Sequence, residues 1–223
     1  MYKPLILSTK ILPYGLRERI VQNGLAYMEY NAIRVSPIAF EMPPPVDYVI
    51  FSSQNATNAV LKKAHSLQQS NVLCVGKQSE NLLLENQIKP LKTTKNMSEL
   101  IDFIQKIDKK GQFLHFCGNR RLPLLAKKMK VWERDFKEVV VYQTEGANTK
   151  IDATPSAVLF FSPSGVESYE KHNNIANTHC FCIGSTTAAA LKQTPKSVHV
   201  MVNPNTEQLV SKAIHYFKLS QHA

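Results

Sequence analysis

Hydroxyl-bearing residues and a glycine follow an apolar run near residue 157 in an order that suits the binding of an anion. The run, residues 157–161, precedes Ser162, Ser164 and Gly165, and an amphipathic segment follows. This order predicts a buried strand, a tight polar loop and the start of a helix. Free backbone N–H groups and the helix dipole favour a negatively charged ligand there. An ordinary turn whose serine caps the helix has the same pattern, so one such loop leaves both interpretations open.

The same pattern of residue types occurs a second time in the chain. Residues 49–60 repeat that order, with Ser53 and Asn55 in the places of the two later serines. Further on, LCVGKQSENLLL and FCIGSTTAAALK align Gly76 with Gly184 at nearly the same separation. Self-similarity over so long a period indicates two repeated structural units. We therefore expect two related α/β halves, each with several loops at strand ends.

Composition and charge bound the class of protein. The chain has 223 residues, of which 43% are hydrophobic and 20% charged, as in globular proteins with a real core. Its net charge of +10 fits nucleic acid, an anionic small molecule or a solvated surface. The basic residues are spread along the chain, without a recognised nucleic-acid motif. We assign those beside the predicted loops, Lys10, Lys77, Arg120 and Arg121, to an anionic ligand.

The cysteines and the apolar runs indicate an intracellular protein. No apolar run reaches the roughly 18 residues of a membrane span, and the first residues lead into a strand without the features of a signal peptide. All four cysteines fall in or beside apolar runs, which favours reduced core thiols. A metal site would need closer pairs with matching histidines, and we expect Cys180 and Cys182 to project to opposite faces of their strand.

Apolar periodicity and turn residues predict strands that alternate with helices. We expect strands at residues 5–8, 30–35, 48–51, 72–75, 88–91, 112–117, 138–142, 157–161, 179–183 and 197–200. Helices are expected at residues 13–23, 55–65, 79–85, 99–107, 122–130, 166–172, 186–193 and 206–217. This alternation predicts parallel sheets with helices on both faces, whose ligands bind beyond the carboxyl ends of the strands. The proline-rich residues 36–48 and the polar residues 143–155 are the two candidate connections between domains.

Taken together, the loop motifs carry a family resemblance. In order along the chain they are IFSSQNATNAV, CVGKQSE, FCGNRR, VVVYQTEG, FFSPSGVESY, CIGSTTAAAL and NPNTEQLV. Each motif alone is a generic strand, turn and helix, but the whole series resembles the uroporphyrinogen-III synthases from residue 6 to about residue 216. The resemblance implies two α/β domains with parallel sheets, joined by a two-stranded connector, with the active site in the cleft between them and closure about the connector.

The resemblance also implies where the domains begin and end. The first domain is discontinuous, with residues 1–34 and 147–223, and the second has residues 38–142. The connector then consists of residues 35–37 and 143–146. The two candidate connections predicted from composition fall at these joins.

The reaction implied by the resemblance belongs to tetrapyrrole (heme) biosynthesis. Such an enzyme, a hydro-lyase, converts hydroxymethylbilane to uroporphyrinogen III through loss of water, inversion of the last pyrrole ring and ring closure. Loss of the hydroxyl gives an azafulvene, which forms a spiro intermediate that fragments and recloses. No metal or organic cofactor is expected. The expected protein is a cytoplasmic monomer without nucleic-acid or membrane partners, which receives its substrate by transient handover from hydroxymethylbilane synthase.

Site residues are carried over where this chain matches the motifs. Tyr142 is the implied catalytic residue, hydrogen-bonding or protonating the departing hydroxyl, although a tyrosine at a domain edge also has a purely structural interpretation. Ser79 stands where the family commonly has threonine, and Lys10 where arginine is usual. The expected substrate-binding residues are Lys10, Ser53, Asn55, Gly76, Ser79, Asn119, Arg120, Ser162, Ser164, Gly165, Gly184, Thr186 and Thr187.

Two other classes of function stay open at this point. A tetrapyrrole or polyanion binder could keep the fold and lack turnover, and the charge alone suggests a nucleic-acid-binding module. The implied reaction needs no Ser-His-Asp set, and we find none placed convincingly in the sequence.

Overall fold

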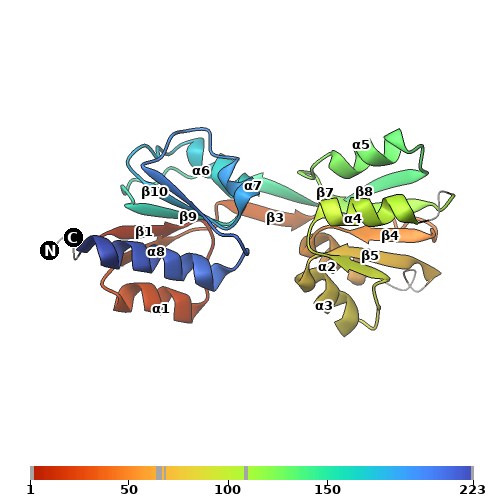
Figure 1. Cartoon of the computed structure of the whole chain (residues 1–223), viewed down its shortest axis with the longest axis horizontal. Coiled ribbons are helices and arrows are strands. Elements are labelled where there is room, and N and C mark those ends of the chain that lie inside the picture. The colour runs from red at the N-terminus through yellow and green to blue at the C-terminus, as the bar shows by residue number, and fades with distance from the viewer. Residues whose placement is uncertain (1–2, 64–66, 68, 108–109, 222–223) are drawn as a thin grey trace. The chain divides into compact units, whose positions relative to one another are not determined.

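Two compact α/β units make up the chain, which is described here by a computed structural model covering residues 3–63, 67, 69–107 and 110–221. Unit 1 comprises Met1–Arg34 and Glu145–Ala223, and unit 2 comprises Val35–Thr144. In each unit helices cover both faces of a central sheet (Figure 1). The parallel α/β fold class predicted from the sequence is confirmed.

Unit 1 has a five-stranded sheet in the order β11-β10-β9-β1-β2, in which all adjacent strands are parallel. Its strands are β1 (Leu5–Ser8), β2 (Ala26–Glu29), β9 (Ala157–Phe160), β10 (His179–Cys182) and β11 (Ser197–Val200). Helices α1 (Tyr14–Gln22) and α8 (Thr206–Gln221) cover one face, and α6 (Pro163–Glu170) and α7 (Ser185–Ala188) cover the other. Strand β9, for example, consists of consecutive apolar residues in the sequence because both faces of the sheet are buried.

Unit 2 has a six-stranded sheet in the order β3-β8-β7-β4-β5-β6. Its strands are β3 (Ile33–Pro37), β4 (Tyr48–Phe51), β5 (Asn71–Val75), β6 (Lys92–Thr94), β7 (Phe113–Gly118) and β8 (Phe136–Gly146). Helices α2 (Gln54–Leu61) and α3 (Lys77–Glu85) pack on one face, and α4 (Met97–Lys106) and α5 (Leu124–Val131) on the other. Strands β4 to β8 are parallel neighbours, so the loops that follow β4, β5 and β7 meet at one edge.

Strands β3 and β8 both pass from one unit into the other. Backbone hydrogen bonds join Ala147 N–H to the Ala32 carbonyl and Ile38 N–H to the Val141 carbonyl, at 2.8 and 3.0 Å. Strand β3 ends at Pro37 and lies at the edge of its sheet, the position in which a strand tolerates proline. The predicted domain limits and hinge at these strands stay a prediction.

Several predicted elements were displaced along the sequence. The strand expected at residues 30–35 is replaced by two strands, β2 and β3, on either side of a short turn. The strand expected at residues 88–91 is β6 at Lys92–Thr94, and β8 extends into the expected polar connection as far as Gly146. The helix expected at residues 186–193 is the single turn α7. The last two residues of the predicted helix 55–65 lie outside the described part.

All four cysteines are free and buried, as expected for core thiols. Burial raises the pKa of the Cys180 and Cys182 thiols to about 12. The expectation that these two side chains occupy opposite faces was wrong. Both lie in the same apolar cluster of unit 1, because residues two apart in a strand share a face. In the described part of the chain, no helix combines the length and apolar character needed to cross a membrane.

Two histidines lie beneath α8 in unit 1. His179 Nδ1 lies 2.7 Å from Ser197 Oγ, which lies 2.8 Å from His199 Nε2. Burial lowers the pKa of His179 and of His199, with Lys196 and Lys212 respectively adding to the effect. Tyr216 of α8 packs against both rings. Protonation of either ring therefore places a charge in a site built for the neutral form.

We predict that the free energy of unfolding falls as the pH drops below the ordinary histidine pKa of 6.5. The folded pKa is depressed, so the unfolded chain binds more protons in this window, and stability is retained above it. Denaturant titrations between pH 7.5 and 5.5 measure the slope, which the double variant His179→Gln/His199→Gln should flatten. The control His172→Gln changes an exposed histidine. An unaltered slope in the double variant would contradict this account.

Candidate functional site

The loop after β4 places two serines at the carboxyl edge of the unit 2 sheet. Ser53 is the N-cap of α2, and its hydroxyl accepts a hydrogen bond from the Asn55 N–H at 3.2 Å. Phe51 and Ala56 on either side are fully buried, which fixes the turn between strand and helix. The predicted strand, polar loop and helix start are therefore present here, with Ser53 in the capping role that its residue type favours.

Tyr142 reaches this loop because β8 contains a bulge. Cys117 pairs with Val140 but Gly118 pairs with Tyr142, so Val141 is the additional residue. A bulge changes which face the following side chains occupy. Tyr142 consequently lies on the α2 side of the sheet, where its hydroxyl donates to Ser53 Oγ at 3.0 Å. Side chain and loop are thus joined directly.

Gly118 allows the Tyr142 ring to lie close to the backbone of β7. A Cβ atom at Gly118 would lie 2.6 Å from Tyr142 Cε2 and 2.7 Å from its hydroxyl oxygen, closer than real Cβ contacts. Asn119 holds the next part of β8, since its Oδ1 accepts from the Thr144 N–H at 2.8 Å and its own N–H donates to the Tyr142 carbonyl at 3.2 Å. The predicted binding residue Asn119 therefore positions the strand that carries Tyr142.

A chain of polar side chains occupies the other face of the same edge. Ser52 Oγ lies 2.7 Å from His115 Nε2, and His115 Nδ1 lies 3.1 Å from Glu138 Oε1. The carboxylate can only accept, so in the neutral imidazole Nδ1 carries the proton and Nε2 accepts from Ser52. Arg121 completes the chain with its Nε 2.8 Å from Glu138 Oε2. The hydrogen bond from His115 and the Arg121 guanidinium hold the pKa of Glu138 below its ordinary value.

These hydrogen-bonded side chains correct the expectation that no Ser-His-Asp set is present, because Ser52, His115 and Glu138 form such a set with glutamate as the acid. The residues come from β7, β8 and two loops, and no spacing in the sequence signals their contact. His115, Glu138 and the Cys117 thiol also lie close enough to hold a metal ion. Burial raises the pKa of Cys117 to about 11, however, and Glu138 is paired with the Arg121 guanidinium. The donors are thus arranged as a hydrogen-bonded chain that ties the β7 loop to the β4 loop.

The glycine loops of the two units differ in conformation. Gly76 precedes α3 with a φ of 86°, a left-handed conformation that favours glycine, whereas Gly184 precedes α7 with an extended backbone. Ser79 and Thr187, the corresponding hydroxyl residues, are each 2% exposed. Thr186 is exposed at the start of α7. Of these residues, only the glycines and Thr186 are accessible without a change in the helices.

The loop after β9 presents the serines of unit 1. Ser162 is the N-cap of α6 and accepts from the Gly165 N–H at 3.1 Å, while Ser164 is half-buried in the first turn. Lys10, from the neighbouring loop after β1, is exposed and holds its Nζ 5.7 Å from the centroid of the Phe161 ring. These residues therefore gather at the carboxyl edge of the unit 1 sheet, as predicted.

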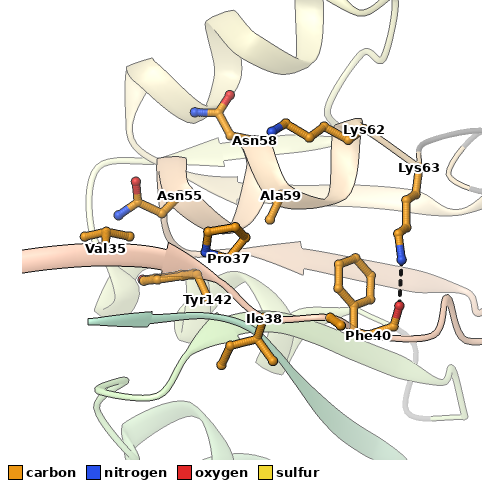
Figure 2. Close-up of a pocket in the computed structure, with 11 residues that line it drawn as sticks. Val35, Pro37, Ile38, Phe40, Asn55, Asn58, Ala59, Lys62, Lys63 and Tyr142 are labelled. Atoms are coloured by element: carbon orange, nitrogen blue, oxygen red, sulfur yellow. Dashed lines mark hydrogen bonds between the residues drawn. The ribbon is translucent and has the colours of Figure 1, made fainter. Parts of the chain in front are cut away.

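A cavity of about 470 Å³ opens beside Tyr142 within unit 2. Of the predicted residues, Tyr142 and Asn55 line it, and Figure 2 shows Asn55 on α2 and Tyr142 on β8. Arg120 is exposed in the loop after β7 and is not one of the cavity's lining residues. Lys62 and Lys63 also line the cavity. Neither was predicted from the sequence as a binding residue, because both follow α2 rather than precede it.

Comparison with solved structures shows where this fold occurs. A uroporphyrinogen-III synthetase from Helicobacter pylori superposes with a TM-score of 0.70 and 18% identity, covering 96% of this chain and 99% of the other. A mutant uroporphyrinogen III synthase from Thermus thermophilus gives 0.70 with 14% identity, covering 99% of this chain and 100% of the other. At these identities the likeness shows the fold alone.

Sequence comparison supplies the family. No curated protein matches the chain. The family model described as uroporphyrinogen-III synthase HemD matches residues 15–211, which is most of the sequence. The chain therefore belongs to the uroporphyrinogen-III synthase HemD family.

Proposed function

We propose that this chain cyclises hydroxymethylbilane to uroporphyrinogen III, with loss of water and inversion of the last ring, as a hydro-lyase. Family membership supports the activity. One observation supports placing the reaction at the carboxyl edge of the unit 2 sheet: the Tyr142 hydroxyl lies 3.0 Å from Ser53 Oγ, and Tyr142 lines a cavity. No metal or organic cofactor takes part in the proposed reaction.

Tyr142 acts on the departing hydroxyl. A phenol can donate a hydrogen bond or a proton to an oxygen that leaves as water. In the absence of substrate its proton is directed to Ser53, so exchange of that partner for the substrate oxygen costs little. The substituted α-carbon of the last ring then attacks the azafulvene methylene to form the spiro intermediate, which fragments at the old bridge and recloses with that last ring inverted. The protein's remaining task is to hold the chain so that this path is faster than direct closure.

Backbone N–H groups and hydroxyls at helix starts bind the substrate's carboxylates. The proposed residues are Lys10, Ser53, Asn55, Gly76, Ser79, Asn119, Arg120, Ser162, Ser164, Gly165, Gly184, Thr186 and Thr187. Helix starts suit carboxylates because their N–H groups are unpaired and the dipole is favourable. The net charge of +10 adds a long-range attraction for a polyanion. We also propose a cytoplasmic monomer that receives its substrate by transient handover from hydroxymethylbilane synthase.

The test of the proposed function is the isomer that forms. Purified protein is given freshly prepared hydroxymethylbilane, and the oxidised products are separated. Predominance of isomer III at a rate above spontaneous closure is expected. Isomer I alone, at the spontaneous rate, would mean that the chain binds without turning over.

Replacing Tyr142 by Phe should lower kcat by roughly a hundredfold, the scale of a general acid's contribution. Stability should fall by only about 1 kcal/mol, because one hydrogen bond is lost. The control Tyr48→Phe alters a strand tyrosine of the same unit that stacks on Phe113. Equal rates for the two variants would remove Tyr142 from the mechanism.

Gly118→Ala tests the same role while keeping the hydroxyl. The added methyl group overlaps the Tyr142 ring, so kcat should fall although Tyr142 is present. Gly111→Ala is the matched control, because its Cβ would lie 2.7 Å from the Tyr48 ring instead. A similar loss of kcat in both variants would show a general loss of packing rather than displacement of Tyr142.

Gly184→Val tests the backbone cradle of unit 1. The backbone there is extended, and a Cβ would meet only Pro204 Cγ at 3.8 Å, so the variant should fold normally. Branched methyl groups would obstruct close approach of a carboxylate to the α7 N–H groups. We expect a higher KM with an unchanged melting temperature. A wild-type KM would show that this loop does not contact substrate.

A further inference from the structure

The cavity beside Tyr142 is formed by one face of α2 and the chain segment that faces it. Its residues from α2 and the turn after it recur at helical spacing, which places their side chains in a row: Asn55, Asn58, Ala59, Lys62 and Lys63. Val35, Pro37, Ile38, Ala39 and Phe40 supply the opposite wall, with Tyr142 at one end. All of these residues belong to unit 2. The cavity is therefore a feature of one unit.

The walls of the cavity combine apolar surface with hydrogen-bond donors. Val35, Pro37 and Phe40 contribute apolar surface, and Asn55 and Asn58 project amides from α2 (Figure 2). Its lining residues include two lysines and no carboxylate. Cavities of roughly 300–1,000 Å³ with apolar walls and few polar groups are typical small-molecule sites. A flat heteroaromatic ring with carboxylate substituents matches this chemistry.

The two lysines at the cavity have different roles. Lys63 donates to the Phe40 carbonyl at 2.7 Å, and its Nζ lies 4.5 Å from the centroid of the Phe40 ring. It thus fastens the facing segment to α2. Lys62 has no ion-pair partner among the residues that the structure describes, and its side chain is exposed at the cavity. Lys62 is therefore available to a ligand's carboxylate.

We propose that this cavity binds one pyrrole ring of the linear tetrapyrrole, the ring that bears the hydroxymethyl group, and that Lys62 pairs with a carboxylate of that ring. The inference rests on the proposed function, in which Tyr142 acts on the departing hydroxyl. Because Tyr142 lines the cavity, the ring beside it is the one that carries this hydroxyl. The apolar walls receive the ring, and Asn55 and Asn58 donate to its second carboxylate.

The test uses a monopyrrole that carries one acetate and one propionate side chain, titrated into the full chain by calorimetry. Lys62→Glu should weaken binding about tenfold or more, since charge-assisted hydrogen bonds are among the strong ones and the reversed charge repels. Lys127→Glu, on the exposed face of α5, changes the net charge equally and should have little effect. Ala59→Phe fills the cavity without altering charge and should also weaken binding.

Turnover of hydroxymethylbilane gives the second readout. Lys62→Glu should raise KM and lower the proportion of isomer III, while Lys127→Glu keeps both at the wild-type value. If wild-type protein forms isomer III but the two lysine variants behave alike, the cavity assignment is wrong and the proposed function stands. If wild-type protein forms isomer I alone, the proposed function fails, and the monopyrrole titrations still decide whether the cavity binds a pyrrole.

Discussion

A single additional residue in β8 determines how the unit 2 edge is arranged. With Val141 accommodated as a bulge, Tyr142 falls opposite Gly118 and on the same face as α2. If Val141 paired regularly with Gly118 instead, Tyr142 would fall one position later, on the face covered by α4 and α5, and its hydroxyl could not meet Ser53. The missing side chain of Gly118 and the amide of Asn119 then hold this arrangement from β7. The candidate chemistry thus depends on strand register more than on residue type.

The adjacent serines after β4 connect the two faces of the sheet. Ser53 meets Tyr142 on one side, and Ser52 meets His115 on the other. The second contact continues through Glu138 to Arg121, whose guanidinium forms an ion pair with the Glu138 carboxylate. Cations near a loop are therefore not equivalent: Arg121 and Lys63 maintain structure, whereas Lys62 faces the cavity. The high net charge alone could not separate these roles.

Much of the fold followed from local patterns in the sequence, and the contacts of the site did not. Apolar runs before Ser53 and Ser162 predicted strand, loop and helix start because these are local properties. Tyr142 was found only through the family resemblance, and Ser52, His115 and Glu138 were missed, because strands distant in sequence bring them together. The strand expected at residues 30–35 was misplaced since Tyr30 and Ala32 extend the apolar pattern across a turn. A bulge leaves no signal in residue periodicity.

The helices that follow Ser53, Gly76, Ser162 and Gly184 share one property, which is that the hydrogen-bond donors of their first turns belong to the main chain. A peptide N–H is present whichever side chain its residue carries. A surface built from such groups therefore tolerates wide replacement of residues provided that strand lengths and turns are kept. This tolerance accounts for the same fold persisting in proteins that are only 14–18% identical to this chain. Binding by such groups therefore depends on the conformation of the backbone rather than on the identity of particular side chains.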